Sequence, residues 1–348
     1  MNGNPDQRHR YLGAARLVTL VALAATLAGC GRGGSSCNDQ DVWCAGLVTD
    51  FGSVDQGINE QAWLAMEDAR ASGILDRIDR IETVDSRDRS ANIAAFAQQR
   101  YDIVVTVGTS IAEETTSAAI QYPNTAFIGV EQYQQEVTPN LTGLVFHEEQ
   151  GGYLAGALAA QMTQTGRIGA VCEAKFIDSI RRYCEGFRAG AAATDPTLRI
   201  QIAYREGSAQ TVFQDPGWGK AAADDEVDDG VDVLFAAGGE TADAALEEAA
   251  ARRAMVIGTE VDAYSRLEGV RSMLLTSAVN DIRGGVAALL QRARDGQLPA
   301  GNYFGQVDLA PFHELESQVP PGVPPKLADI RQAMATGKIR VDVPYLSP

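Results

Sequence analysis

Residues 45–71 read AGLVTDFGSVDQGINEQAWLAMEDARA and contain the pattern that decides the fold. The apolar run Ala45–Val48 predicts a buried strand, and the apolar spacing from Asn59 to Ala71 predicts an amphipathic helix. A polar turn that contains glycine joins the two. Because a buried strand followed by a turn and a helix is the repeating unit of a parallel sheet, the stretch predicts an α/β protein.

The same alternation continues along the chain in two successive series. The further predicted strands are 103–107, 126–130, 141–146, 167–171, 200–204, 231–235 and 254–258. Helices are predicted at about 110–120, 153–162 and 181–191, and another between the last two strands. Two series of strand–helix units predict two doubly wound lobes. In such sheets ligands bind beyond the carboxyl ends of the strands, so the residues that follow each strand are candidates for a site.

Composition excludes several classes of protein. The chain has 348 residues, 45% of them hydrophobic, and a formal net charge of −17, which disfavours nucleic acid as a partner because phosphate backbones are repelled. The chain lacks the G-x-S-x-G, G-x-x-x-x-G-K-[ST] and H-E-x-x-H motifs, and it has only three His. We therefore expect no catalytic residues, no metal and no cofactor.

The N-terminus has the pattern of an export signal. Arginines precede the uncharged run Leu17–Gly29, which is short for a membrane span of about 20 residues. Leu27-Ala28-Gly29-Cys30 resembles the lipobox of bacterial lipoproteins. We expect residues 1–29 to be removed, Cys30 to be lipidated and residues 30–41 to form a flexible tether on the outer face of the cell membrane. The alternative is an ordinary secretory peptide in which Cys30 has no role.

Export changes the expectation for the other cysteines. With Cys30 acylated, an even number remains in an oxidising compartment, and three pairings are possible. We favour Cys37–Cys44 and Cys172–Cys184, because each closes a short loop. The alternative is four buried free thiols.

Carboxylates, amides and aromatic rings follow the predicted strands, and basic residues do not. A phosphate ligand would call for Arg or Lys, so the pattern favours a neutral polar ligand, and carboxylates suit neighbouring sugar hydroxyls. Phe213 offers a face for a planar ring, although core packing would explain it equally well, and capping of a helix would explain Asp55. The candidate ligand-binding residues are Asp50, Phe51, Asp55, Asn59, Gly108, Thr109, Phe213, Gly238, Glu260, Asp262 and Asn280.

Several segments together resemble the basic membrane protein family, which includes purine-nucleoside-binding lipoproteins. The resemblance begins at Gly46–Trp63 and spans the chain that follows the signal. Its further segments are Phe146–Glu149, Gly152–Gly156, Glu185–Gly190, Phe213–Pro216, Ala236–Gly238, Val256–Gly258, Leu275–Ser277 and Gly337–Val341.

The resemblance implies a type I periplasmic-binding-protein fold, in which two Rossmann-like lobes are joined by a three-stranded hinge. It implies an N-terminal lobe of residues 42–146 plus about 259–298, and a C-terminal lobe of residues 147–258 plus about 299–348. A monomer that delivers a purine nucleoside to the permease and ATPase of an ABC importer is then expected. The family's ribose-binding acid falls on Glu260, and its second acid falls on Asp262.

The chain departs from the family pattern at four places. The turn after Asp50 is one residue short, Ile58 stands where the family has Phe, Glu260 replaces Asp, and Asn280 replaces Lys. Two other functions remain open from the residues: an exported nucleoside or glycoside hydrolase that uses the carboxylates, and a sensor subunit for a membrane partner.

Overall fold

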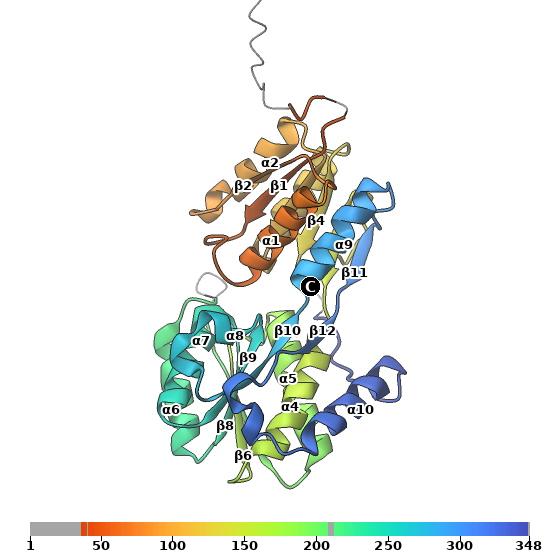
Figure 1. Ribbon diagram of the computed structural model, residues 1–348. Helices are drawn as coiled ribbons and strands as arrows, with labels where there is room; N and C mark the ends of the chain where they lie inside the picture. Colours follow the sequence, from red (N-terminus) through yellow and green to blue (C-terminus); the bar gives the residue numbers. More distant parts are fainter. Residues whose placement is uncertain (1–35, 40, 208–211, 347–348) are drawn as a thin grey trace, which may run out of the picture. The chain divides into compact units, whose positions relative to one another are not determined.

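A computed structural model describes residues 36–39, 41–207 and 212–346 (Figure 1). The expected signal peptide, Cys30 and most of the tether lie outside the described residues, so these expectations stay predictions. The described residues form two lobes, each built on one six-stranded sheet.

The N-terminal lobe has the strand order β11-β5-β4-β3-β1-β2, and its adjacent strands are parallel. Its strands are β1 (Cys44–Thr49), β2 (Arg77–Ile81), β3 (Ile103–Val107), β4 (Ala126–Val130), β5 (Leu141–Val145) and β11 (Gly301–Phe304). Its helices are α1 (Gly57–Ala71), α2 (Arg89–Gln98), α3 (Ala112–Gln121) and α9 (Ile282–Arg294). Apolar residues of α1 and α9 form one core of this lobe, and those of α2 and α3 form another.

The C-terminal lobe repeats this order as β12-β10-β9-β8-β6-β7, and only its edge strand β12 is antiparallel. Its strands are β6 (Arg167–Cys172), β7 (Arg199–Tyr204), β8 (Val233–Ala237), β9 (Met255–Glu260), β10 (Leu274–Asn280) and β12 (Val307–Leu309). Its helices are α4 (Glu148–Met162), α5 (Asp178–Thr194), α6 (Pro216–Asp228), α7 (Gly239–Ala251), α8 (Ala263–Arg266) and α10 (Val323–Ala335). One core joins the sheet to α4, α5 and α10, and a second joins it to α6 and α7.

The chain crosses between the lobes three times: after β5, after β10 and after β11. These crossings move two of the expected lobe boundaries. Residues 259–280 were expected in the N-terminal lobe, but β10 pairs with β9 in the C-terminal sheet, and the crossing falls at Asp281. Conversely, β11 was expected in the C-terminal lobe but pairs with β5 in the N-terminal sheet. The choice of partner strand leaves no local pattern in the sequence, so the expected boundaries fell at other residues.

Both favoured disulfides are confirmed, Cys37–Cys44 and Cys172–Cys184. The second joins β6 to α5. The predicted strands are also confirmed, while α4 and α5 begin five and three residues earlier than expected, at Glu148 and Asp178. In the described part of the chain, no helix combines the length and the apolar character needed to cross a bilayer.

Candidate functional site

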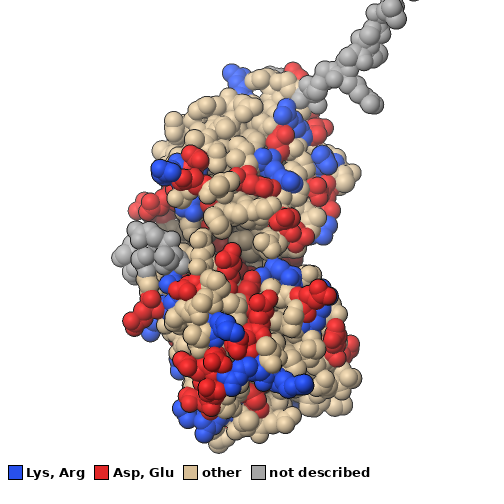
Figure 2. Space-filling view, turned by 90° about the vertical axis from the view of Figure 1, so that its left-hand side faces the viewer, with Lys and Arg blue, Asp and Glu red and all other residues tan. Residues whose placement is uncertain are grey.

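A cavity of about 740 Å³ is lined by residues of both lobes. In the N-terminal lobe its walls come from the segments that follow β1, β2, β3 and β4. In the C-terminal lobe they come from the end of β9, the first turns of α7 and the segment before α6. The site therefore lies where ligands bind in doubly wound sheets, beyond the carboxyl ends of the strands. On the face shown in Figure 2, acidic side chains border the hollow.

Asp50 is held against the backbone of the neighbouring strand. Its backbone N–H donates to the carbonyl of Val107 at 3.0 Å. A Cβ on Gly108, whose φ is +107°, would stand 2.1 Å from Oδ2 of Asp50, so only glycine lets the carboxyl lie there. Burial raises the pKa of Asp50 to about 6, against the opposing positive charge of Arg89. Arg89 itself donates to the carbonyl of Asp50 at 3.0 Å rather than to the carboxyl.

Glu131 is a second acid of the N-terminal wall, directly after β4. Its backbone is left-handed, with a φ of 61°, and only 8% of the residue is exposed. Its Oε1 accepts from Nδ2 of Asn280 at 3.2 Å, and Oδ1 of Asn280 accepts from the hydroxyl of Tyr183 at 2.8 Å. Burial, reinforced by repulsion from Glu260 and Glu148, raises the pKa of Glu131 well above its ordinary value.

Glu260 faces these groups from the end of β9, also with a left-handed backbone of φ 69°. Burial raises its pKa to about 7; the negative charges of Asp243 and Asp50 add to this, and the positive charge of Arg266 opposes it. Arg266 lines the cavity but forms an ion pair with Asp243, donating at 2.7 Å to Oδ1. The basic charge of Arg266 is thus already matched by an acid.

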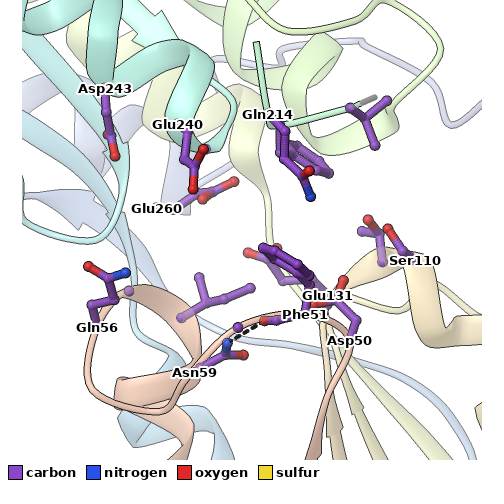
Figure 3. Close-up of a pocket in the computed structure, with 18 of the residues that line it drawn as sticks. Asp50, Phe51, Gln56, Asn59, Ser110, Glu131, Gln214, Glu240, Asp243 and Glu260 are labelled. Carbon is purple, nitrogen blue, oxygen red and sulfur yellow. Dashed lines mark hydrogen bonds between the residues drawn. The ribbon is translucent and has the colours of Figure 1, made fainter. Parts of the chain in front are cut away.

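Asn59 and Phe51 complete the N-terminal wall (Figure 3). The Nδ2 of Asn59 donates to the carbonyls of Phe51 and Ser53, at 3.0 and 3.1 Å. Its buried Oδ1 has no hydrogen-bond partner among the described residues, so an acceptor is available beside the cavity. Phe51 is half exposed, and Phe213 lines the cavity from the other lobe.

Most of the sequence candidates line the cavity: Asp50, Phe51, Asn59, Gly108, Thr109, Phe213 and Glu260. Four do not line it. Asp55 is exposed, and it does not cap α1, which begins after Gln56 without a side-chain cap. The Asp262 carboxylate lies 2.7 Å from Nε2 of His313 and caps α8. Gly238 lies against Glu173, and Asn280 reaches the cavity only through Glu131.

Six further acidic and basic residues line the cavity that the sequence did not indicate, namely Asp85, Arg89, Glu131, Glu240, Asp243 and Arg266. Glu131 could have been found, because it directly follows the predicted strand 126–130. Asp243 and Arg266 lie inside helices, where sequence position does not reveal which side chains reach a cavity.

This geometry defines a class of protein, the two-lobed ligand binders of the type I periplasmic-binding fold, and solved structures agree. A solute-binding protein of an ABC transporter system from Aeropyrum pernix K1 has a TM-score of 0.72 at 18% identity, over 87% of this chain and 94% of that one. One from Conexibacter woesei DSM 14684 has a TM-score of 0.70 at 21% identity, over 86% and 99%.

The family follows from sequence. Residues 45–305 match the family model Bmp, described as ABC transporter substrate-binding protein PnrA-like, so the chain belongs to the Bmp family of ABC transporter substrate-binding proteins. Relatives include the ABC transporter nucleoside-binding protein BmpA of Lactococcus lactis, 26% identical over 92% of this chain and 94% of that protein. The CD4+ T-cell-stimulating antigen of Listeria monocytogenes is 24% identical over 94% and 97%.

Proposed function

We propose that this protein is a lipid-anchored receptor that captures a neutral nucleoside, with purine expected, and delivers it to an ABC importer. It acts as a monomer outside the cytoplasm, tethered through Cys30. One observation carries the proposal: the cavity combines carboxyl groups and the unpartnered Oδ1 of Asn59 with aromatic rings from both lobes. The name of the Lactococcus relative supports the choice of a nucleoside.

The chemistry of the walls favours a ligand that donates hydrogen bonds and carries no phosphate. Asp50, Glu131 and Glu260 offer carboxyl groups, and Asn59 offers a free Oδ1. Ribose hydroxyls and base N–H groups are donors that would satisfy them, whereas a phosphate would meet several acids. The two arginines among the described lining residues already donate to other groups. Arg266 is paired with Asp243, and Arg89 donates to the backbone carbonyls of Asp50 and Ser110.

We assign roles by position in the cavity. Asp50 and Asn59, at the N-terminal wall, bind polar edges of the base, and Phe51 and Phe213 pack against its faces. Glu260, from the C-terminal lobe, accepts from the ribose hydroxyls. Glu131 provides a further carboxyl between them. Because contacts come from both lobes, the ligand stabilises the arrangement in which the lobes enclose it.

The test is calorimetric titration of the protein, lacking residues 1–29, with adenosine, guanosine, inosine and uridine, and with their 5′-monophosphates. We expect at least one purine nucleoside to bind, and its monophosphate to bind at least about 100-fold more weakly, since charge repulsion and desolvation both oppose it. Absence of binding by every nucleoside would refute the ligand assignment. Chromatography of the recovered ligand tests the hydrolase alternative, because release of free base would show turnover.

A sensor role is the second candidate, because regulators share this fold: a transcriptional activator of the comK gene from Bacillus halodurans has a TM-score of 0.68 at 22% identity. Deleting the gene and measuring uptake of labelled nucleoside separates the two roles. Transport predicts loss of uptake, whereas unchanged uptake would favour the sensor.

A further inference from the structure

The segment Val341–Leu346 has no regular secondary structure, yet hydrogen bonds tie it to the start of α5. Nη1 of Arg182 donates to the carbonyl of Val343 at 2.8 Å, and Arg181 donates to the carbonyl of Pro344. The backbone N–H of Leu346 donates to Oδ1 of Asp178 at 2.8 Å. The segment is therefore anchored to the C-terminal lobe at three successive points.

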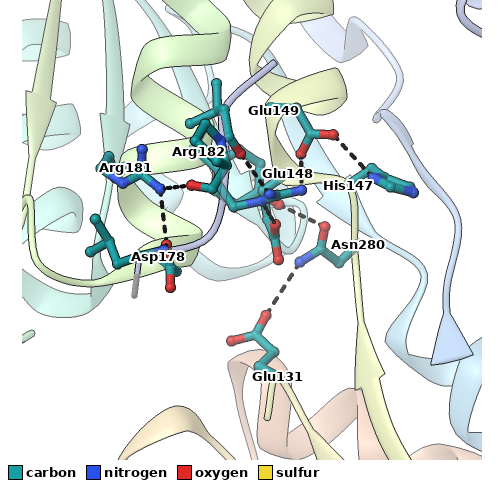
Figure 4. A network of polar contacts seen from close by, with 12 residues as sticks. Glu131, His147, Glu148, Glu149, Asp178, Arg181, Arg182 and Asn280 are labelled. Carbon is teal, nitrogen blue, oxygen red and sulfur yellow. Dashed lines mark hydrogen bonds and ion pairs between the residues drawn. The ribbon is translucent and has the colours of Figure 1, made fainter. Parts of the chain in front are cut away.

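Arg182 gives this anchor a defined geometry (Figure 4). Its side chain is 5% exposed, its Nε donates to Oε2 of Glu148 at 2.9 Å, and its Nη2 donates to Glu149. The guanidinium carbon lies 4.1 Å from the centre of the Tyr345 ring. A guanidinium held by two carboxylates cannot turn freely, so the ring that packs on it is held as well.

Tyr345 in turn contacts the N-terminal lobe. Its ring stacks on Tyr133, with centroids 3.8 Å apart and an angle of 16° between the planes. The hydroxyl of Tyr345 is buried and has no hydrogen-bond partner among the described residues. The contact between the lobes is therefore made by the ring and not by the hydroxyl.

Tyr133 lies two residues after Glu131, in the segment that leaves β4. The left-handed backbone of Glu131 is strained for a residue with a side chain and persists only where its surroundings hold it. Gln132 donates to the carbonyl of Gly108 at 3.0 Å, and the N–H of Gln134 donates to Oδ1 of Asn302 at 2.8 Å. These supports come from the N-terminal lobe, whereas Tyr345 supports the same segment from the other lobe.

We infer that Tyr345 is a positioning residue for ligand binding. By stacking on Tyr133 it holds residues 131–134, and with them the cavity carboxyl of Glu131, in a fixed position relative to the C-terminal lobe. Asn280 makes the matching contact between the lobes at Glu131 itself. The segment that carries Glu131 is thus fastened to the C-terminal lobe twice, once at its carboxyl and once through Tyr133. Only the choice of ligand in the test rests on the proposed function.

The experiment compares Tyr345→Ala, Tyr133→Ala, the double variant and Tyr345→Phe by calorimetric titration with the best-binding nucleoside. Each single alanine variant should weaken binding about 2- to 10-fold, the range that an aromatic pair supports. The double variant should bind no more weakly than the weaker single variant, because both remove the same contact. Tyr345→Phe should bind like the unmodified protein.

A second measurement does not depend on the ligand. Spin labels at Ile120→Cys on α3 and Asp225→Cys on α6, both exposed positions, report the distance between the lobes of the ligand-free protein. Tyr345→Ala should broaden that distance distribution, and Tyr345→Phe should not. An unchanged distribution in Tyr345→Ala, or additive losses in the double variant, would overturn the inference. If no nucleoside binds even the unmodified protein, the proposed function fails and the distance measurement alone decides this inference.

Discussion

The two lobes place an acid and a glycine at matched positions, but they use the acid differently. In the N-terminal lobe Asp50 follows β1 and lies on Gly108, which follows β3. In the C-terminal lobe Glu173 follows β6, and Gly238 follows β8 with a φ of +123°. A Cβ on Gly238 would stand 2.2 Å from Cβ of Glu173, so both glycines allow the same close approach.

The difference between these acids lies in their charge partners. Glu173 is fully buried and forms an ion pair with Arg205. It does not line the cavity, whereas Asp50 does, and the nearby Arg89 donates to the backbone carbonyl of Asp50 and not to its carboxyl. The same backbone arrangement therefore stabilises the lobe where an arginine pairs with its acid, and lines the binding cavity where the acid is left for a ligand.

The largest expected effect is on stability, and it comes from removing the ion pair between Glu173 and Arg205. Glu173→Gln removes the nearer of the two carboxylates that pair with the buried Arg205 among the described residues, the other being Asp215 at 3.7 Å. This loss of charge should lower the free energy of unfolding by about 3 kcal/mol. Asp50→Asn should change it far less, because Arg89 donates to the backbone carbonyl of Asp50, which the substitution keeps. Urea denaturation of both variants checks the contrast, and equal losses would mean that the two acids have the same structural role.

The next effect concerns the two glycines. Gly108→Ala and Gly238→Ala should each cost about 2 kcal/mol, since an alanine would be strained at these φ values and would collide with the acid beside it. Only Gly108→Ala should also weaken nucleoside binding, because it displaces the cavity carboxyl of Asp50. Thermal unfolding and calorimetric titration separate the two effects, and a binding loss in Gly238→Ala of equal size would contradict the distinction.

A smaller effect is expected on affinity alone. Asp50→Asn should weaken nucleoside binding about tenfold, because it removes a charged acceptor from the ligand. The matched control is Asp55→Asn, a change five residues away at an exposed position outside the cavity lining. Titration of both variants with the same nucleoside provides the check; a comparable loss in the control would show that local charge, and not the cavity contact, controls affinity.

The smallest expected effect is on the pH dependence of stability. Because the pKa of Glu260 in the folded protein is about 7, above its ordinary 4.5, folding favours the protonated form. Its stabilising contribution is therefore complete below about pH 4.5 and is lost as the pH rises toward 7. Glu260→Gln should remove this dependence. Because Glu260 is partly exposed and solvent screens its charge, we expect the ligand-free variant to be about 1 kcal/mol more stable than the unmodified protein at pH 8, which is less than the full pKa difference would give. Denaturant titrations from pH 4.5 to 8 measure it; parallel curves for the two proteins would refute it.

Much of the fold could be predicted because its signals are local. The strands β3 and β4 are short apolar runs between polar turns, and Cys172 and Cys184 close a loop short enough to make their pairing the natural one. The lobes of β10 and β11 could not be predicted in this way. Each depends on which strand it pairs with, β9 for β10 and β5 for β11, and local periodicity is the same for either partner.

The candidate site shows the same division. The rule that ligands lie beyond strand ends correctly indicated Asp50 and Glu260 as neighbours of a cavity. The rule also indicated Asp262, but the carboxylate of Asp262 lies beside His313. Asp262 is only two residues after Glu260, and position in the sequence does not reveal which of the two side chains faces the cavity. Asp243 and Arg266 pair across two helices, which no spacing in the sequence reveals.

The sequence by itself determined the series of strand–turn–helix units, the acids at the strand ends and the two disulfide loops, because each depends on residues close together in the chain. Only the tertiary structure decided which lobe receives β10 and β11, that Glu131 joins the cavity, and that Glu173 forms a buried ion pair while Asp50 lines the cavity. The physical reason is that strand pairing, burial and charge compensation depend on groups that come together only when the chain folds.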